Sequence, residues 1–141
     1  MQSLKLREEI GDKMGIANSY NNVGSVYYNQ GDYKKGLEYM KKSLNLRKEI
    51  GDKSGEALTS INLGTIYKNL GNMTEALFYF RNALQLREAT GDKKGIAIAT
   101  NNIGAVFSVQ GNYVEAMNAF MTVFKIYTEI NDKLGLASAY N

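Results

Sequence analysis

Apolar side chains recur every three or four residues over most of the chain, which is the spacing that lines one face of an α-helix. In the first such stretch they include Tyr20, Val23 and Tyr27, and in the second they include Leu37 and Met40. The pattern stops at glycines and then resumes, so the sequence predicts an all-α fold. The expected helices cover residues 14–30, 33–50, 54–70, 73–90, 94–110 and 113–130.

The pattern has a period of forty residues that never slips. Its clearest marker, GDKMG at 11–15, returns as GDKSG at 51–55, GDKKG at 91–95 and NDKLG at 131–135. A fixed period of this length is typical of solenoids, in which each helical hairpin buries its apolar face against the next one. We therefore predict a single array over 1–141, made of a partial second helix at 1–10, repeats at 11–50, 51–90 and 91–130, and a partial first helix at 131–141.

Glycines mark the joints between the predicted helices. Within each repeat a glycine stands where a helix should end in a left-handed residue, at Gly31, Gly71 and Gly111. Between repeats the joint carries glycine three times and asparagine once, at Gly11, Gly51, Gly91 and Asn131. An aspartate follows each of these joints and is interpreted as a structural residue: Asp12, Asp52, Asp92 and Asp132.

The residues inside each block resemble the tetratricopeptide repeat. The first helix carries a large residue, an apolar residue followed by glycine, and an aromatic, as in Tyr20, Val23, Gly24 and Tyr27. The second carries a small residue, a large one and another small one, as in Ala76, Phe80 and Ala83. The resemblance implies an α-solenoid, a right-handed superhelix of antiparallel hairpins. Because the repeat is longer than the usual length of about 34 residues, it is similar to those of Pins-type polarity adaptors, kinesin light chains and bacterial signalling proteins.

The resemblance also implies where a partner binds, because the first helices of this family form the concave wall that is the usual peptide groove. The matching positions are mostly uncharged, with apolar spots. They are Asn18, Asn21, Asn22, Ser25, Tyr28, Leu58, Ile61, Asn62, Thr65, Lys68, Ile98, Asn101, Asn102, Ala105 and Val109. Family members that bind chaperone tails clamp a terminal carboxylate with lysines and an arginine. Of the equivalent positions here only Asn62 agrees, so we do not expect a carboxylate clamp.

Asn22, Asn62 and Asn102 recur two residues before the repeat glycine and allow two interpretations. In long-repeat relatives an asparagine there often grips the main chain of a bound peptide, and an amide can both donate and accept. On this interpretation the three side chains form a ladder along an extended ligand. On the other, they brace neighbouring helices. We favour the ladder, which requires that the amides face one continuous surface.

The second predicted helix is rich in basic residues, namely Lys34, Lys35, Lys41, Lys42, Arg47 and Lys48. This allows either a nucleic-acid patch or a solvated face. We favour the solvated face, because Glu38 and Glu49 interrupt the run and the helix is expected on the convex side. The ten tyrosines recur at repeat positions, which indicates packing rather than base stacking. We therefore predict no nucleic-acid partner.

The composition excludes several kinds of metal-binding and catalytic site. The chain has no cysteine and no histidine, so it can build neither a thiolate or imidazole zinc site nor a catalytic triad. No apolar run approaches the roughly 20 residues of a membrane span, and residues 1–10 lack the apolar core of a signal peptide. No phosphate loop or pair of carboxylates stands out. We predict no cofactor, no metal, no enzyme activity and no membrane contact, and we expect a cytoplasmic protein.

Three hypotheses of function follow. The first is a protein- or peptide-binding scaffold in a larger signalling protein, the second is a structural module that assembles end to end, and the third, least favoured, is an enzyme. The partial helices at 1–10 and 135–141 favour a segment of a longer array over a complete short protein. Each end then presents surface that fits another hairpin, which predicts self-association.

Overall fold

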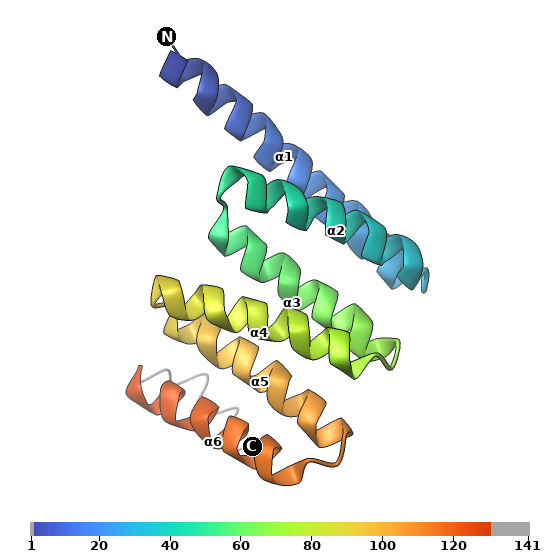
Figure 1. The fold of residues 1–141 in the computed structure, drawn as a ribbon, viewed down its shortest axis with the longest axis vertical. Helices are drawn as coiled ribbons and strands as arrows, with labels where there is room; N and C mark the ends of the chain where they lie inside the picture. Colours follow the sequence, from blue (N-terminus) through green and yellow to red (C-terminus); the bar gives the residue numbers. More distant parts are fainter. Residues whose placement is uncertain (1, 131–141) are drawn as a thin grey trace.

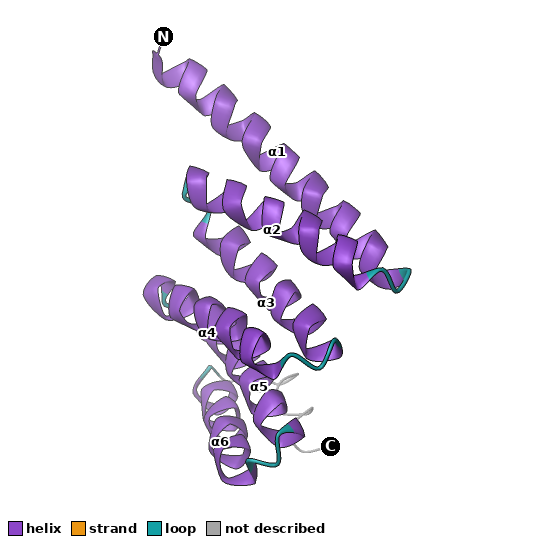
Figure 2. Ribbon diagram, turned by 45° about the vertical axis from the view of Figure 1, so that its right-hand side comes forward, coloured by secondary structure: helices purple, strands orange, loops and turns teal. Residues whose placement is uncertain are grey.

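The structure is a computed structural model that describes residues 2–130, with side chains from residue 8 onward. Six α-helices follow one another: α1 (Gln2–Asn29), α2 (Tyr33–Ile50), α3 (Lys53–Asn69), α4 (Met73–Thr90), α5 (Lys93–Val109) and α6 (Tyr113–Glu129). The described residues contain no strand (Figure 2). The all-α prediction is confirmed, and α2 to α6 begin and end within one residue of the predicted ranges. The expected helix at 131–141 lies outside the described residues.

The start of the first helix was predicted wrongly. We expected a joint at Gly11 and a helix from residue 14, but α1 runs without a break from Gln2. Gly11 is not among the glycines with positive φ. A continuous helix keeps the backbone hydrogen bonds that a bend would lose, and in the described structure no earlier helix packs against this end to fix a bend. The first half of α1 therefore projects beyond α2 (Figure 1).

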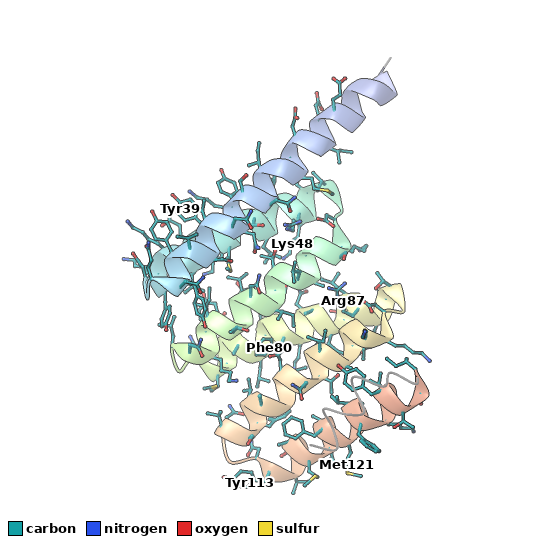
Figure 3. The ribbon with its side chains drawn as sticks, turned by 180° about the vertical axis from the view of Figure 1, so that it is seen from behind. Tyr39, Lys48, Phe80, Arg87, Tyr113 and Met121 are labelled. Atoms are coloured by element: carbon teal, nitrogen blue, oxygen red, sulfur yellow. The ribbon has the colours of Figure 1, made fainter. Side chains whose placement is uncertain are left out.

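The helices pair into hairpins that stack in sequence order, α1 with α2, α3 with α4, and α5 with α6 (Figure 1). The first helices α1, α3 and α5 lie on one side of the stack, in front of α2 and α4 in Figure 3. Within a hairpin, glycines allow close approach: a Cβ added at Gly36 would lie 3.2 Å from the carbonyl oxygen of Gly24. In the second hairpin the ring of Phe80 fills the space beside Gly64.

Apolar clusters join the hairpins. Met40 and Leu44 of α2 pack against Leu63 and Ile66 of α3, and all four are buried. One repeat later Phe80 of α4 and its neighbours pack against α5 in the same manner. Burying a side chain of this size contributes about 1.5–3 kcal/mol. These clusters, rather than helix propensity alone, hold the array together.

The joints between repeats are built as the glycine pattern predicts, from α2 onward. Gly51 and Gly91 end α2 and α4 in the left-handed conformation, with φ of 74° and 69°. Asp52 and Asp92 then start the next helix, each accepting a hydrogen bond from a backbone N–H three residues later. This confirms the structural interpretation of these two aspartates.

The interpretation of Arg47 as part of a solvated basic face is wrong. Arg47 is only 5% exposed. Its guanidinium donates to Asp52 Oδ2 at 2.6 Å, to Asn18 Oδ1 at 2.7 Å and to Ser43 Oγ at 3.3 Å. One side chain thus ties α1, α2 and the start of α3 together. The missed signal is a spacing, because an arginine five residues before the joint aspartate recurs at Arg87.

Helix caps within the repeats offer a matched test. Asn72 caps α4 by accepting a hydrogen bond from the backbone N–H of Glu75 at 3.1 Å, whereas Asn112, the N-cap of α6, makes no side-chain cap bond. We expect Asn72→Ala to lower the free energy of unfolding by about 1 kcal/mol. Asn112→Ala should lower the free energy of unfolding by only a few tenths of a kcal/mol. Urea unfolding of both variants checks the difference, and equal losses would contradict the role given to the Asn72 side chain.

Candidate functional site

The side of the stack formed by the first helices carries polar side chains that bridge from one repeat to the next. The Asn62 amide of α3 donates to Asn21 Oδ1 of α1 at 3.3 Å. Farther along the same two helices, the Asn69 amide donates to the Tyr28 hydroxyl. Positions about forty residues apart therefore meet across the α1–α3 boundary.

Between these two bridges lies a hollow of about 260 Å³. It is lined by Ser25, Tyr28, Asn29, Met40, Asn62, Thr65 and Ile66. The predicted groove residues Ser25, Asn62 and Thr65 are thus brought together, along with Tyr28. Asn29 and Asn69 were missed, although their identity at equivalent positions of adjacent repeats was a signal in the sequence.

The three repeat asparagines do not share one environment. Asn62 is half-buried and bonds to the neighbouring first helix, as the bracing interpretation expects. Asn102 donates instead to the Ile98 carbonyl of its own helix at 3.0 Å. Asn22 is exposed. The difference has a local cause, because the residue of α3 equivalent to Asn21 is Ile61, which packs against the core and offers no acceptor.

Other predicted groove residues divide into structural and exposed positions. Asn18 accepts a hydrogen bond from Arg47, and Ile61 packs against two core clusters, so both have structural contacts. Lys68 and Ala105 are half-buried. The remaining four positions are exposed. Three are apolar, with exposed fractions of 50% for Leu58, 49% for Ile98 and 61% for Val109, and the fourth is Asn101.

The five lysines of α2 are exposed, as the solvated-face interpretation expects, and three of them also lie over tyrosine rings. The Lys41 Nζ lies 5.4 Å from the centre of the Tyr67 ring, and a hydrogen bond with Tyr67 raises the pKa of the Lys41 ammonium. Burial raises the pKa of the Tyr79 hydroxyl beside it. Lys42 pairs with Glu38 at 3.7 Å, an exposed contact that contributes little. Tyr67 and Tyr79 belong to the apolar packing between repeats, so Lys41 lies over a structural tyrosine pair.

The described part of the chain contains no group of three or more acidic, histidine or cysteine side chains placed to hold a metal ion. It also contains no helix that is both long enough and apolar enough to span a bilayer. What the first-helix side offers is hydrogen bonding by amides and hydroxyls beside exposed apolar spots.

Comparison with known proteins agrees with this architecture. Residues 15–89 and 55–129 each match the family model described as tetratricopeptide repeat. No curated protein has a significantly similar sequence.

Three solved structures are similar in fold. The TPR domain of FLU from Arabidopsis has a TM-score of 0.75 and 20% identity, over 80% of this chain and 95% of that one. The second TPR of Spaghetti (RPAP3), bound to the HSP90 peptide SRMEEVD, has a TM-score of 0.67 and 20% identity, over 84% and 98%. A signal-transduction ATPase with a tetratricopeptide repeat sensor, from Pyrococcus horikoshii, has a TM-score of 0.81 and 21% identity, over 98% of this chain but 22% of that one. At such identities the likeness concerns the fold.

Proposed function

Because the chain belongs to the tetratricopeptide repeat family, we propose that it is a non-catalytic scaffold that binds a protein or peptide along the side formed by α1, α3 and α5. Proteins of this fold serve as interaction modules, and the RPAP3 repeat domain is bound to a peptide. The Pyrococcus horikoshii ATPase uses such repeats as a sensor, which supports a regulatory role for this chain.

The observation that carries the proposal is the hollow between α1 and α3. Its rim combines the amides of Asn29 and Asn62 with the hydroxyls of Ser25, Tyr28 and Thr65, and its floor contains the apolar Met40 and Ile66. Main-chain amides of an extended peptide need both donors and acceptors, and this rim supplies both. A small side chain of the ligand fits the apolar floor.

The chemistry favours an uncharged or weakly charged segment. Among the candidate groove residues only Lys68 carries a charge, and it is half-buried. A highly acidic tail would therefore find little to neutralise it. We propose protein partners rather than nucleic acid or lipid, because Lys41 and Lys42 of α2 lie beside a tyrosine and an acid of the array.

Asn62→Ala tests the proposed groove. Peptides are first selected from a phage-displayed random library on the wild-type chain, and their dissociation constants are then measured by calorimetry. We expect the substitution to weaken binding by about 1–2 kcal/mol, because it strands the hydrogen-bonding partner in the ligand. It also removes the bond to Asn21, so the melting temperature is measured alongside.

Asn45→Ala is the matched control, since Asn45 is an exposed amide on α2, away from the hollow. It should bind the selected peptides as the wild type does. Peptides that bind Asn62→Ala unchanged but lose affinity for the Asn45 variant would place the site on the other side of the stack.

A second candidate function is self-assembly, and a separate observation favours it. Both ends of the described stack expose large apolar side chains, among them Val26 at 55% and Met117 at 60%. Their equivalents inside the array pack between hairpins. We propose that these end faces let copies of the chain associate.

A further inference from the structure

We infer that the exposed face of α4 is a second binding surface, which takes an acidic segment of another protein with one apolar side chain among its carboxylates. The groove proposed above lies on the side formed by α1, α3 and α5. The helix α4 lies with α2 on the other side of the stack, which faces the reader in Figure 1. The inference goes beyond the groove and does not depend on it, because the two surfaces share no residue.

The surface is built from side chains on successive turns of one helix. Thr74, Phe78, Arg81, Asn82 and Gln85 line a hollow of about 400 Å³, called the α4 hollow from here on. Spacings of three and four residues place these side chains on one helical face. Phe78 is 63% exposed, and only Asn82 of the five is half-buried. The α4 hollow thus combines an aromatic ring, a cation and three groups that form hydrogen bonds.

The exposure of Phe78 does not come from an end of the described stack. The hairpin that follows it, α5 with α6, is described and leaves Phe78 uncovered. One repeat earlier the equivalent residue Glu38 is also exposed, although α3 and α4 follow it. The next hairpin therefore does not cover this position, and packing between repeats does not require a phenylalanine there.

The α4 hollow departs from the pattern that the repeats share. At the position of Phe78 the other two repeats carry Glu38 and Asn118, which are polar and exposed. In α2, Glu38 pairs with Lys42 at 3.7 Å, and α4 has Phe78 and Asn82 in their places. An ion pair suited to water is thus replaced by an aromatic ring beside an amide. Exposing such a ring is unfavourable, and a partner that covers it gains from the burial.

Contacts from the side hold two walls of the hollow in place. The plane of the Phe78 ring lies at 88° to that of Tyr79, with the ring centres 5.1 Å apart. Tyr79 in turn stacks on Tyr67 at 5.6 Å. The Asn82 amide donates to Ser60 Oγ at 2.9 Å, which ties this side chain to α3. Side chains that are ordered before binding lose less entropy when a partner arrives.

Arg81 supplies the charge that selects the partner. Its equivalent in α2, Lys41, lies 5.4 Å from the centre of the Tyr67 ring. Within the part of the chain that the structure describes, Arg81 has neither an ion pair nor a contact with an aromatic ring. A guanidinium can take a carboxylate through two parallel hydrogen bonds. Of the described residues that line the hollow, Arg81 alone is charged, so charge complementarity favours an acidic segment.

A nucleic acid fits this face less well than an acidic protein segment. A nucleic-acid strand carries a phosphate at every nucleotide, so binding requires cations at several places along its path. The helix α4 instead carries Glu75 before Arg81 in the sequence and Glu88 after it. A protein segment needs one carboxylate for Arg81 and one apolar side chain for Phe78, and aromatic and arginine residues are the usual anchors of protein interfaces.

Two substitutions test the surface, Phe78→Asn and Arg81→Met. Each introduces the residue type that the third repeat carries at the same exposed position, in Asn118 and Met121, so the fold should be kept, which circular dichroism checks. The probes are short fluorescein-labelled peptides in which a leucine, phenylalanine or tryptophan is flanked by aspartates and glutamates. Each peptide has a matched version with asparagine and glutamine in place of the acids. Fluorescence anisotropy measures the dissociation constants.

We expect acidic peptides to bind the wild-type chain at least about tenfold more tightly than their amide versions, because only a carboxylate pairs with Arg81. Phe78→Asn and Arg81→Met should each weaken the acidic peptides at least about tenfold, as the loss of an interface anchor does. Arg81→Met should also remove the preference for the acidic version. Lys34→Met is the matched control, because it removes one exposed cation from α2. It should bind these peptides as the wild type does.

The outcomes separate this surface from the proposed groove. The inference is overturned if no acidic peptide binds more tightly than its amide version, or if binding survives both substitutions in α4. It is also overturned if Asn62→Ala weakens the acidic peptides and Phe78→Asn does not, because the peptides then bind in the groove. A single-stranded oligonucleotide that binds with the same dependence on Phe78 and Arg81, where the acidic peptides do not bind, would replace the protein partner by a nucleic acid. None of these results removes the groove, which is tested by its own selected peptides.

Discussion

Arg47→Met is expected to lower the free energy of unfolding by about 3 kcal/mol, the lower end of what breaking a buried ion pair costs. The Arg47 side chain is 6% exposed and that of Asp52 is 15% exposed. Methionine fills much of the same volume but donates no hydrogen bond. The substitution therefore leaves the Asp52 carboxylate without its cation and removes donors from Asn18 and Ser43.

The next repeat supplies a matched comparison. Arg87 and Asp92 form the equivalent pair at 3.3 Å, but their side chains are 20% and 41% exposed. Water can therefore replace much of what Arg87 provides, and Arg87→Met should cost about 1 kcal/mol or less, as exposed ion pairs usually do.

Urea unfolding followed by circular dichroism measures both losses. Similar losses at the two joints would show that burial of the ion pair does not set its contribution. The m-value, which is the slope of the unfolding free energy against urea concentration, should be the same for all variants. A changed m-value would indicate that the array no longer unfolds as one unit.

The sequence predicted the helices well because the period and the joint glycines depend on local chemistry. A glycine such as Gly51 adopts the left-handed conformation that ends a helix at little steric cost. Gly11 carries the same local signal but is helical, because the bend between repeats also depends on contacts with an earlier hairpin. The local pattern predicted the end of a helix correctly where a neighbouring hairpin also packs against the joint. It failed at Gly11, where the described structure has no such hairpin.

The candidate site was predictable as a face but not in its contacts. The resemblance to the tetratricopeptide repeat placed Ser25, Asn62 and Thr65 on one side of the array, and they do line one hollow. The sequence could not show that Asn62 bonds to Asn21, because that contact joins residues forty-one positions apart and depends on how adjacent hairpins are offset. Arg47 was misjudged for a related reason, since helical spacing alone does not show which lysines and arginines of a basic helix are covered.

Gly64→Leu is expected to destabilise the protein by about 1–3 kcal/mol, the usual range for overpacking a filled core. A Cβ at position 64 would lie 2.5 Å from Phe80 Cε1, a separation that real Cβ atoms do not show. Phe80 is 0% exposed and packs in the cluster with Ile103 and Val106, so its ring can move only by disturbing α5.

Gly15→Leu is the control for helix propensity. Gly15 also lies within a helix, but an added Cβ there meets nothing within 4 Å. Leucine favours the helix over glycine by a few tenths to about 1 kcal/mol. We therefore expect this variant to be neutral or slightly more stable, which isolates the steric part of the loss at Gly64.

A double substitution identifies the neighbour that causes the strain at Gly64. Phe80→Ala alone should cost about 3–5 kcal/mol, because it leaves a cavity in a buried cluster. Combined with Gly64→Leu, it opens space for the new side chain, so the double variant should lose less than the two single losses together. Thermal and urea unfolding of the four proteins give the coupling energy. Strictly additive losses would mean that the introduced leucine strains the hairpin elsewhere. The small residue at position 64 would then be needed for the close approach of the α3 and α4 backbones rather than to leave space for the Phe80 ring.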